Sequence, residues 1–372
     1  MILTPPSTRL RGVLCLIVLL AASSGCTAAM PRVRVADDGR TFAVEGTGER
    51  FVPWGFNYDH DEAGRLLEDY WVAEWPKVEQ DFAEMRQLGA TVVRVHLQTA
   101  RFMKSPTEPD EAALEQFARL LALAERTGLR LDVTGLGCYH KQDVPAWYDV
   151  LDEAGRWAVQ ARFWEAVAAR GARSGAVFCY DLMNEPVVPG GSGRKAGEWL
   201  GPPFGGKCFV QFITLTPQGR PRPEIARAWI RQLAAAIRRQ DPRGLVTVGL
   251  VDWSLDRPGL SSGFVPTEVA GDLDFLCVHL YPEKGKSDEQ LQTLAGFAAG
   301  KPVVIEETFP LKCGVEEFDR FMAATRKTAA GWIGFYWGKT PAEMRPARTI
   351  PDALMFGYLE WFQKNTGAFA ER

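Results

Sequence analysis

The sequence lacks the marks of several large classes of protein. It has no CxxC pair and only four histidines in 372 residues, so the spacing typical of a structural zinc site is absent. It carries 43 lysines and arginines against 46 aspartates and glutamates, interspersed along the chain without a basic stripe. This balance argues against a nucleic-acid-binding protein and fits a neutral or weakly charged partner.

The one apolar run near the N-terminus, residues 13–22, is too short to cross a bilayer. Arg9 and Arg11 precede it and small residues follow, which is typical of a secretion signal, here predicted at residues 1–25. The stretch SSGC ending at Cys26 is similar to a bacterial lipoprotein processing site, after which Cys26 would carry a lipid anchor; ordinary signal cleavage is the alternative. Both indicate an exported protein, either extracellular, periplasmic or anchored at the cell envelope.

Five cysteines remain in the body of the chain, an odd number, so at least one thiol is left out of any intramolecular disulfide. Cys179 and Cys277 lie in apolar, strand-like runs and are predicted core residues. Cys138, Cys208 and Cys313 lie in predicted loops, where an exported protein can hold one disulfide. Their pairing stays open.

Eight β-rich runs alternate with amphipathic helical patterns. The runs are residues 51–57, 91–97, 129–135, 176–185, 245–253, 274–282, 302–309 and 332–338. The clearest helical patterns are residues 109–128, 158–175, 223–240 and 315–331, with a last helix from about 353 to 366. Near-continuous apolar strands that alternate with such helices indicate a parallel sheet covered by helices.

Eight such repeats predict a (β/α)8 TIM barrel as a single α/β domain over residues 46–372, after an N-terminal lead-in at 26–45. The rival nucleotide-binding fold should carry a GxGxxG turn after its first strand, and PWGFNYDHDEAG has none. The connection after strand 4, residues 186–222, far exceeds the usual ~2 to 6 residues. Trp199 and Cys208 within it favour an ordered lid over a cleft, and residues 69–75 are expected to form the opposing wall.

In a barrel of this kind the active site lies at the C-terminal ends of the strands. Glu185 ends strand 4 and Glu307 ends strand 7, on opposite sides of the mouth, so their carboxylates can approach each other. Paired carboxylates facing one cavity suit glycosidic cleavage, in which one protonates the departing oxygen while the other attacks or activates water. The other reading of each glutamate is an ordinary rim residue in a salt bridge.

The motif DLMNEP, with Asn184 and Glu185, resembles the acid/base motif of clan A glycoside hydrolases, and of family 5 in particular. The likeness extends over most of the mature chain. The strand 7 motif of that family, laid on KPVVIEETF, implies that Glu307 is the nucleophile. Because side chains alternate along a strand, only one of the two adjacent glutamates is expected to point inward, and Glu306 is expected to point outward or to support its neighbour.

The resemblance also assigns roles to other residues at strand ends. Arg94 matches the arginine that hydrogen-bonds the nucleophile, and Asn184 the residue that binds the sugar 2-hydroxyl. His279 and Tyr281 match the strand 6 pair, with the tyrosine hydroxyl steering the nucleophile. Trp337 matches a flat platform for a sugar ring, with a buried core tryptophan as the alternative.

His140 is a further substrate-binding candidate, although it follows the position at which many relatives carry a strand 3 histidine. The resemblance implies a retaining glycosidase without metal or other cofactor, with Glu307 as nucleophile and Glu185 as acid and base. The expected substrate is an oligo- or polysaccharide, a β-1,4-glucan or β-1,4-mannan cut internally by a monomer. A glycolipid is an alternative substrate, because an apolar lid would suit its lipid part.

Two other classes stay open. A metal-dependent barrel hydrolase is suggested by His96, His140 and His279 near strand ends, but it would need an HxH motif after strand 1, where only His60 stands. A non-catalytic carbohydrate-binding barrel would be favoured if Glu185 or Glu307 were missing, and both are present.

Overall fold

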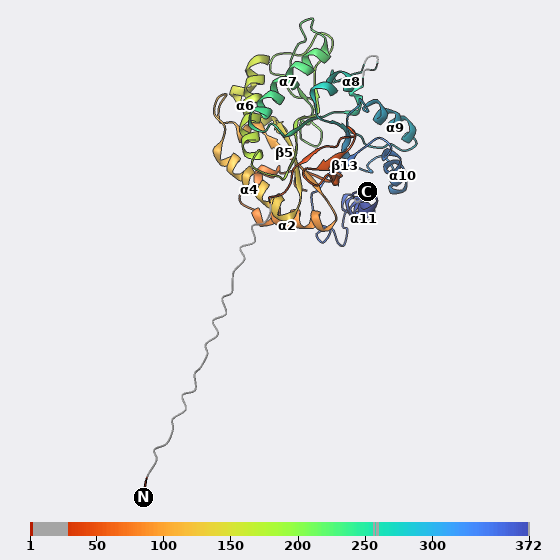
Figure 1. Ribbon diagram of the computed structural model, residues 1–372. Helices are drawn as coiled ribbons and strands as arrows, with labels where there is room; N and C mark the ends of the chain where they lie inside the picture. The colour runs from red at the N-terminus through yellow and green to blue at the C-terminus, as the bar shows by residue number, and fades with distance from the viewer. Residues whose placement is uncertain (3–28, 256, 258–259, 371–372) are drawn as a thin grey trace.

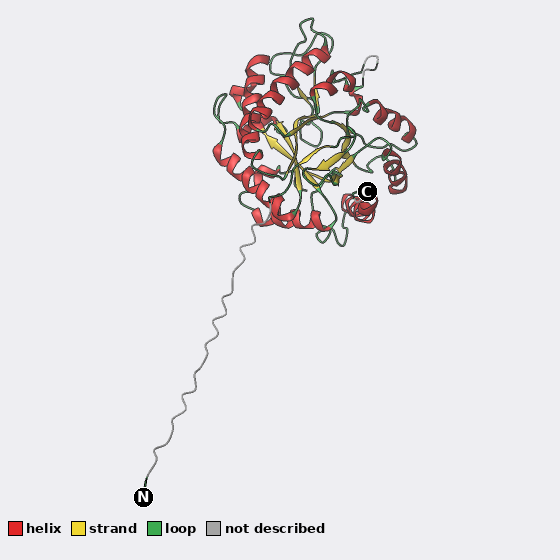
Figure 2. Cartoon of the chain, in the orientation of Figure 1, coloured by secondary structure: helices red, strands yellow, loops and turns green. Residues whose placement is uncertain are grey.

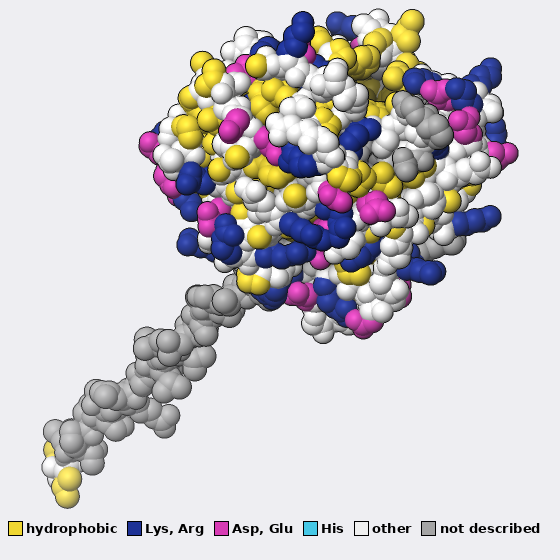
Figure 3. Space-filling model, turned by 90° about the horizontal axis from the view of Figure 1, so that it is seen from above, with side chains coloured by type: hydrophobic (Ala, Val, Ile, Leu, Met, Phe, Trp, Pro, Cys, Tyr) yellow, Lys and Arg dark blue, Asp and Glu magenta, His cyan; other side chains and the backbone are white. Residues whose placement is uncertain are grey.

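The computed structural model describes residues 1–2, 29–255, 257 and 260–370 (Figure 1). The predicted signal segment and Cys26 lie outside the described residues. Within the described part of the chain, no helix combines the length and the apolar character that crossing a bilayer requires. Charged side chains of both signs are interspersed with apolar ones over the face shown in Figure 3.

Eight parallel strands form the centre of the molecule, with helices around them (Figure 2). They are β4 (Trp54–Tyr58), β5 (Val92–Gln98), β6 (Arg130–Gly137), β7 (Val177–Asn184), β10 (Leu245–Gly249), β11 (Leu276–His279), β12 (Val303–Thr308) and β13 (Gly331–Gly334). Their order is β10-β7-β6-β5-β4-β13-β12-β11. The two edges meet where the His279 amide donates to the Leu250 carbonyl at 2.8 Å, beside a parallel bridge between Val251 and His279. The predicted (β/α)8 barrel is therefore confirmed.

Helices follow the strands in the expected alternation. The longer ones are α2 (Trp75–Gln87), α4 (Glu111–Thr127), α6 (Glu153–Gly171), α7 (Arg222–Gln240), α9 (Ser287–Gly296), α10 (Val315–Thr325) and α11 (Ile350–Phe369); α1 (Leu67–Tyr70), α3 (Thr99–Phe102), α5 (Ala146–Asp149) and α8 (Pro266–Val269) are single turns. Capping residues set the ends of α4. The Asp110 side chain accepts from the Ala113 amide at its start, and Gly128 ends the helix with a φ of +72°.

A small antiparallel sheet closes the N-terminal end of the barrel. It consists of β1 (Val33–Val35), β2 (Phe42–Val44) and β3 (Arg50–Phe51). Phe42 is fully buried and meets the rings of Phe178 and Phe275 edge-on at 5.2 and 5.1 Å. The first barrel strand predicted from the sequence, residues 51–57, therefore corresponds to two separate strands. β3 ends at Phe51 and β4 begins at Trp54, because Pro53 between them has no amide hydrogen to donate.

The described cysteines are all free thiols. Cys179 and Cys277 are fully buried, as predicted for core residues. Cys138, Cys208 and Cys313 form no disulfide with one another.

A buried ion pair ties the segment before β1 to the barrel. The Arg32 guanidinium donates to both Asp241 oxygens at 2.9 and 2.8 Å and to the Ala172 carbonyl at 2.8 Å. We expect Arg32→Ala to lower the free energy of unfolding by about 3–5 kcal/mol, because it leaves the buried Asp241 carboxylate unpaired. Urea titration followed by tryptophan fluorescence measures this loss.

Arg34→Ala is the matched control. Its pair with Asp37 is exposed, so unfolding should stay close to that of the wild type. Equal effects of the two substitutions would contradict the assignment.

Candidate active site

A β-bulge in β12 turns both adjacent glutamates into the barrel. Val278 of β11 pairs with Ile305, but the next residue, His279, pairs with Glu307, so Glu306 is an extra residue in the strand. Glu306 is fully buried and Glu307 is 7% exposed. The expectation that only one of them could point inward is therefore wrong, because the bulge interrupts the alternation of side chains.

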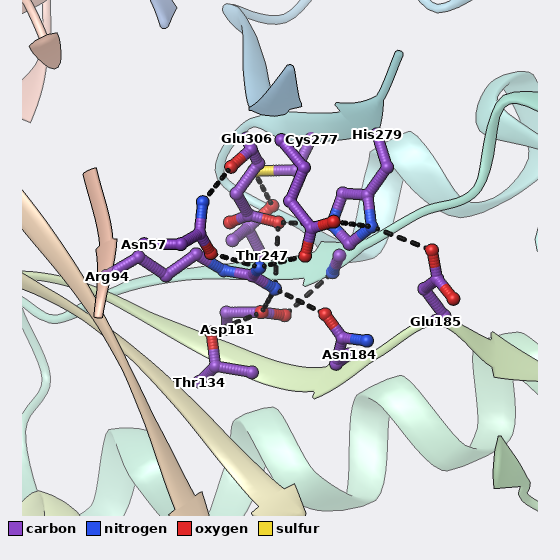
Figure 4. Close-up of polar contacts among 12 residues, drawn as sticks. Asn57, Arg94, Thr134, Asp181, Asn184, Glu185, Thr247, Cys277, His279 and Glu306 are labelled. Atoms are coloured by element: carbon purple, nitrogen blue, oxygen red, sulfur yellow. Dashed lines mark hydrogen bonds and ion pairs between the residues drawn. The ribbon is translucent and has the colours of Figure 1, made fainter. Parts of the chain in front are cut away.

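Arg94 of β5 is the centre of the site (Figure 4). Its guanidinium is fully buried and donates to Glu307 Oε1 at 2.7 Å, the bond expected for the nucleophile. It also donates to Asn57 Oδ1 at 2.9 Å, Asp181 Oδ2 at 2.8 Å and Asn184 Oδ1 at 3.0 Å. One side chain of β5 therefore fixes groups that come from strands β4, β7 and β12.

His279, at the end of β11, bridges three carboxylates. Its Nδ1 lies 3.0 Å from Glu185 Oε1 and 3.5 Å from Glu307 Oε2, and its Nε2 lies 3.3 Å from Glu306 Oε2. Burial lowers the pKa of His279, but the charge of Glu307 and the hydrogen bonds with Glu185 and Glu306 outweigh it and raise the pKa to about 10. The imidazole is therefore a cation at neutral pH.

Glu185 reaches the mouth from a strained backbone. Its φ is +47°, a left-handed conformation that residues other than glycine seldom adopt, and its amide donates to the Gly249 carbonyl at 2.9 Å. Oxygens of Glu185 and Glu307 and a ring nitrogen of His279 all lie within 4.8 Å of one another. The two predicted catalytic carboxylates are thus brought together.

Tyr281 orients the second oxygen of Glu307. The Tyr281 hydroxyl donates to Glu307 Oε2 at 2.7 Å, as expected from the sequence. Burial raises the pKa of Glu307 above its usual value, against the opposing effects of His279, Arg94 and this hydrogen bond. Glu307 therefore ionises at a higher pH than an exposed glutamate.

A second group of acids lies deeper in the barrel. Oxygens of Asp132, Asp181 and Glu306 lie within 4.8 Å of one another. Burial and then the charge of Glu306 raise the pKa of Asp132 well above its usual range and that of Asp181 to about 6. Burial also acts on Glu306, but Arg94 and His279 hold its pKa at about 2. Glu306 is therefore ionised, Asp181 is ionised above about pH 6, and Asp132 carries a proton.

The role of these acids was missed from the sequence. The signal was there, since Asp132 and Asp181 stand in the middle of apolar strands where a charged residue needs a reason. The Asn57 side-chain oxygen accepts from both Arg94 and His96 Nε2, the latter at 3.1 Å.

Trp337 lies outside the site. It is 1% exposed, its Nε1 donates to Asp81 Oδ1 at 3.0 Å, and its ring packs against Phe56. The structure corrects the prediction of a sugar platform in favour of the core alternative. Phe335 and Tyr336 face the cavity instead.

His140 also lies away from the carboxylates, beside Arg101 and Asp143. Tyr139 takes the inward position, and its hydroxyl hydrogen-bonds His96 Nδ1 at 2.5 Å. Burial and the charge of Arg94 hold the pKa of His96 well below its usual value, so His96 is neutral.

The residues suggested for a metal-dependent hydrolase do not gather. In the described chain, the groups with metal-like spacing are Glu185, His279 and Glu307, and the three deeper acids. His96 and His140 belong to neither. In the first group, His279 would have to lose its proton before it could bind a metal.

A cavity of about 470 Å³ opens above the two carboxylates. The connection after β7 forms one wall; it is ordered by a short pairing of β8 (Pro186–Val187) with β9 (Gln211–Phe212), and Trp199 and Cys208 are buried, as expected for a lid. The opposing wall comes from the segments after β12 and β13. It does not come from residues 69–75, where Tyr70, Trp71 and Trp75 are buried in the core.

This arrangement defines a class: a barrel whose mouth holds two opposed glutamates with a shared histidine is typical of glycoside hydrolases. The sequence profile of the cellulase family, glycosyl hydrolase family 5, matches residues 45–340, and the chain belongs to this family. No curated protein sequence matches the chain significantly.

Solved structures of low identity share the barrel fold. An exo-β-1,4-mannosidase from Opitutaceae bacterium strain TAV5 is similar with a TM-score of 0.66 and 18% identity, over 91% of this chain and 62% of that protein. This chain thus spans less than two thirds of the mannosidase. An endo-1,4-β-mannanase from Rhizomucor miehei gives 0.61 and 17% over 90% and 99%. A β-1,4-mannanase from the sea hare Aplysia kurodai gives 0.59 and 17% over 82% and 92%.

We predict that His279 stays protonated well above neutral pH. Its imidazole should titrate near pH 10, and Glu306→Gln should lower that value because it removes an anion 3.3 Å away. The stability contributed by this proton is full below pH 6.5 and is lost as the pH rises towards 10. Nitrogen-15 NMR of the four histidines measures the titration.

Glu79→Gln, which changes an exposed glutamate paired with Arg126, is the control and should leave His279 unaffected. Titration of wild-type His279 near 6.5 would refute the charge assignment.

Proposed function

We propose that the protein is a retaining β-glycosidase, with Glu307 as nucleophile and Glu185 as acid and base. The observation that carries this proposal is the short separation of the two carboxylates, whose oxygens lie within 4.8 Å of each other. Retaining enzymes hold their carboxyl groups ~5 to 5.5 Å apart, whereas inverting enzymes leave ~6.5 to 9.5 Å for a water molecule.

In the first step, the Glu307 carboxylate attacks the anomeric carbon, the bond to the leaving oxygen breaks, and Glu185 gives that oxygen its proton. Arg94 and Tyr281 each hold one Glu307 oxygen, so the attacking group is fixed before the substrate binds. In the second step, Glu185 takes a proton from water, which attacks the same carbon and releases Glu307.

Glu185 changes its role between the two steps. It gives its proton to the leaving oxygen as the ester forms. In the second step it accepts a proton from water, so the two steps use it first as an acid and then as a base. The cationic His279 contacts Glu185, Glu306 and Glu307 and offsets part of their negative charge through the cycle.

For the glycone we propose a β-linked mannose or glucose unit. Family 5 membership supports a β-glycoside, and the similar solved structures include an exo-β-1,4-mannosidase and an endo-1,4-β-mannanase. Internal cleavage of a β-1,4-glucan or β-1,4-mannan, as expected from the sequence, is the polysaccharide form of this proposal.

Glu307→Ala should lower the rate of hydrolysis of aryl β-mannosides and β-glucosides by at least about 10⁴-fold, because the first step loses its nucleophile. Added azide should restore turnover and give the α-configured glycosyl azide, identified by proton NMR. Glu306→Ala with azide is the control, and it should give no glycosyl azide because Glu306 lies below the cavity. A β-configured product, or rescue of Glu306→Ala alone, would overturn the assignment.

Activity should fall as the pH drops through the raised pKa of Glu307, because the protonated carboxyl cannot attack. The midpoint of the acid limb should therefore lie above 4.5. Tyr281→Phe should move this limb to higher pH, since it removes a hydrogen bond to the carboxylate. Profiles of kcat/KM against pH for both proteins test this; a limb moved to lower pH by the substitution would contradict it.

A further inference from the structure

The walls of the cavity above the carboxylates are strongly apolar. The polar side chains at its floor are Asn184, Glu185, Tyr281 and Glu307, and Lys312 is the charged group at its side. The rest of the lining is Pro202, Phe204, Phe209, Val210, Phe309, Leu311, Phe335, Tyr336 and Met355. These residues come from four separate parts of the chain, so the apolar surface is built by the fold and does not come from one stray loop.

The cavity above the carboxylates is the apolar one of two neighbouring cavities. A second cavity of about 460 Å³ shares Phe309, Leu311, Tyr336 and Met355 with the first, but its far part is polar, because it is lined by Glu62, Lys339 and Asp352. We call the first cavity the apolar trough. Its rim leaves large apolar side chains in water: Phe204 is 76% exposed and Leu311 is 58% exposed. Contiguous exposed apolar surface of this kind usually marks a binding site.

Above the floor, this lining offers a sugar chain few hydrogen-bonding groups. Each further sugar unit brings several hydroxyl groups, and a hydroxyl pressed against apolar walls gives up its hydrogen bonds to water without gaining others. Aromatic rings can stack on sugar faces, but Pro202, Val210 and Leu311 are aliphatic. Met355 is an adaptable side chain of the kind that accommodates irregular apolar ligands.

The trough adjoins the proton donor. Phe209 and Val210 belong to the connection that follows Glu185, and the Asn184 side chain donates to the Phe209 carbonyl at 3.2 Å. A leaving group that takes its proton from Glu185 therefore departs beside the apolar wall.

We propose that the leaving group of the substrate is an extended apolar alcohol, such as the alkyl chain of a glycolipid, held in the apolar trough while its sugar sits on the polar floor. This inference rests on the proposed function and specifies its substrate class. The reaction is hydrolysis: water adds to the anomeric carbon, the carbon–oxygen bond to the alkoxy group breaks, and the alcohol leaves with the proton from Glu185.

Alkyl β-mannosides and β-glucosides with methyl, butyl, hexyl and octyl chains, used below their micelle concentrations, test the proposal. We expect kcat/KM to rise about twofold to fourfold per methylene, the range expected for partial to full burial of each group. The octyl glycoside should also exceed the matching β-1,4-linked disaccharide.

Phe204→Ser combined with Leu311→Ser should reduce the octyl-to-methyl ratio of kcat/KM at least tenfold. Both side chains are largely exposed, so the fold should tolerate the change. Val72→Ser is the matched control, because Val72 is 69% exposed and lies outside the trough, and it should keep the wild-type ratio.

Binding of the same glycosides to Glu307→Gln, measured by calorimetry, separates the two proposals. Affinity that rises with chain length in a protein that hydrolyses no glycoside would keep the apolar site and remove the proposed enzyme. Hydrolysis of β-1,4-linked oligosaccharides with no dependence on alkyl chain length would keep the enzyme and overturn the apolar leaving group.

Discussion

The buried guanidinium of Arg94 is the interaction on which the rest of the site depends. It is fully enclosed in the barrel, where an unpaired charge would be very costly, and it is balanced by the carboxylates around it. With His279 as a second cation, it offsets the charges of Glu306 and Glu307. Asp132 stays neutral, so the two cations face the charges of Asp181, Glu306 and Glu307 without a fourth anion beside them.

Two local departures from regular strands give the site its shape. The bulge in β12 brings Glu306 and Glu307 to the same side, so that one lies in the barrel and the next at its mouth. The left-handed backbone at Glu185 turns the opposite carboxylate towards them. Both irregularities lie at the C-terminal ends of strands. There the regular pairing of the sheet ends, and loops can stabilise unusual backbone conformations.

Much of the fold and the chemistry could be predicted from the sequence, because both depend on residue type in sequence order. Eight apolar runs and their helices predict the barrel, and strand ends predict that Glu185, Glu307 and Arg94 converge. The predictions that were wrong concern details of three-dimensional structure. The alternation rule placed the Glu306 side chain on the wrong side of β12. The sequence also does not show that Phe335 faces the cavity while Trp337 packs in the core. The residues of the apolar trough come from segments that lie far apart in the sequence, so no local sequence pattern predicts it.

The most direct test of the central claim is to trap the covalent intermediate. A 2-deoxy-2-fluoro β-glycosyl fluoride, in mannose and glucose configurations, slows the second step, and peptide mass mapping then locates the label. We predict one sugar per chain, as an ester on Glu307. A label on Glu185 or Glu306, or turnover with inversion at the anomeric carbon, would contradict it.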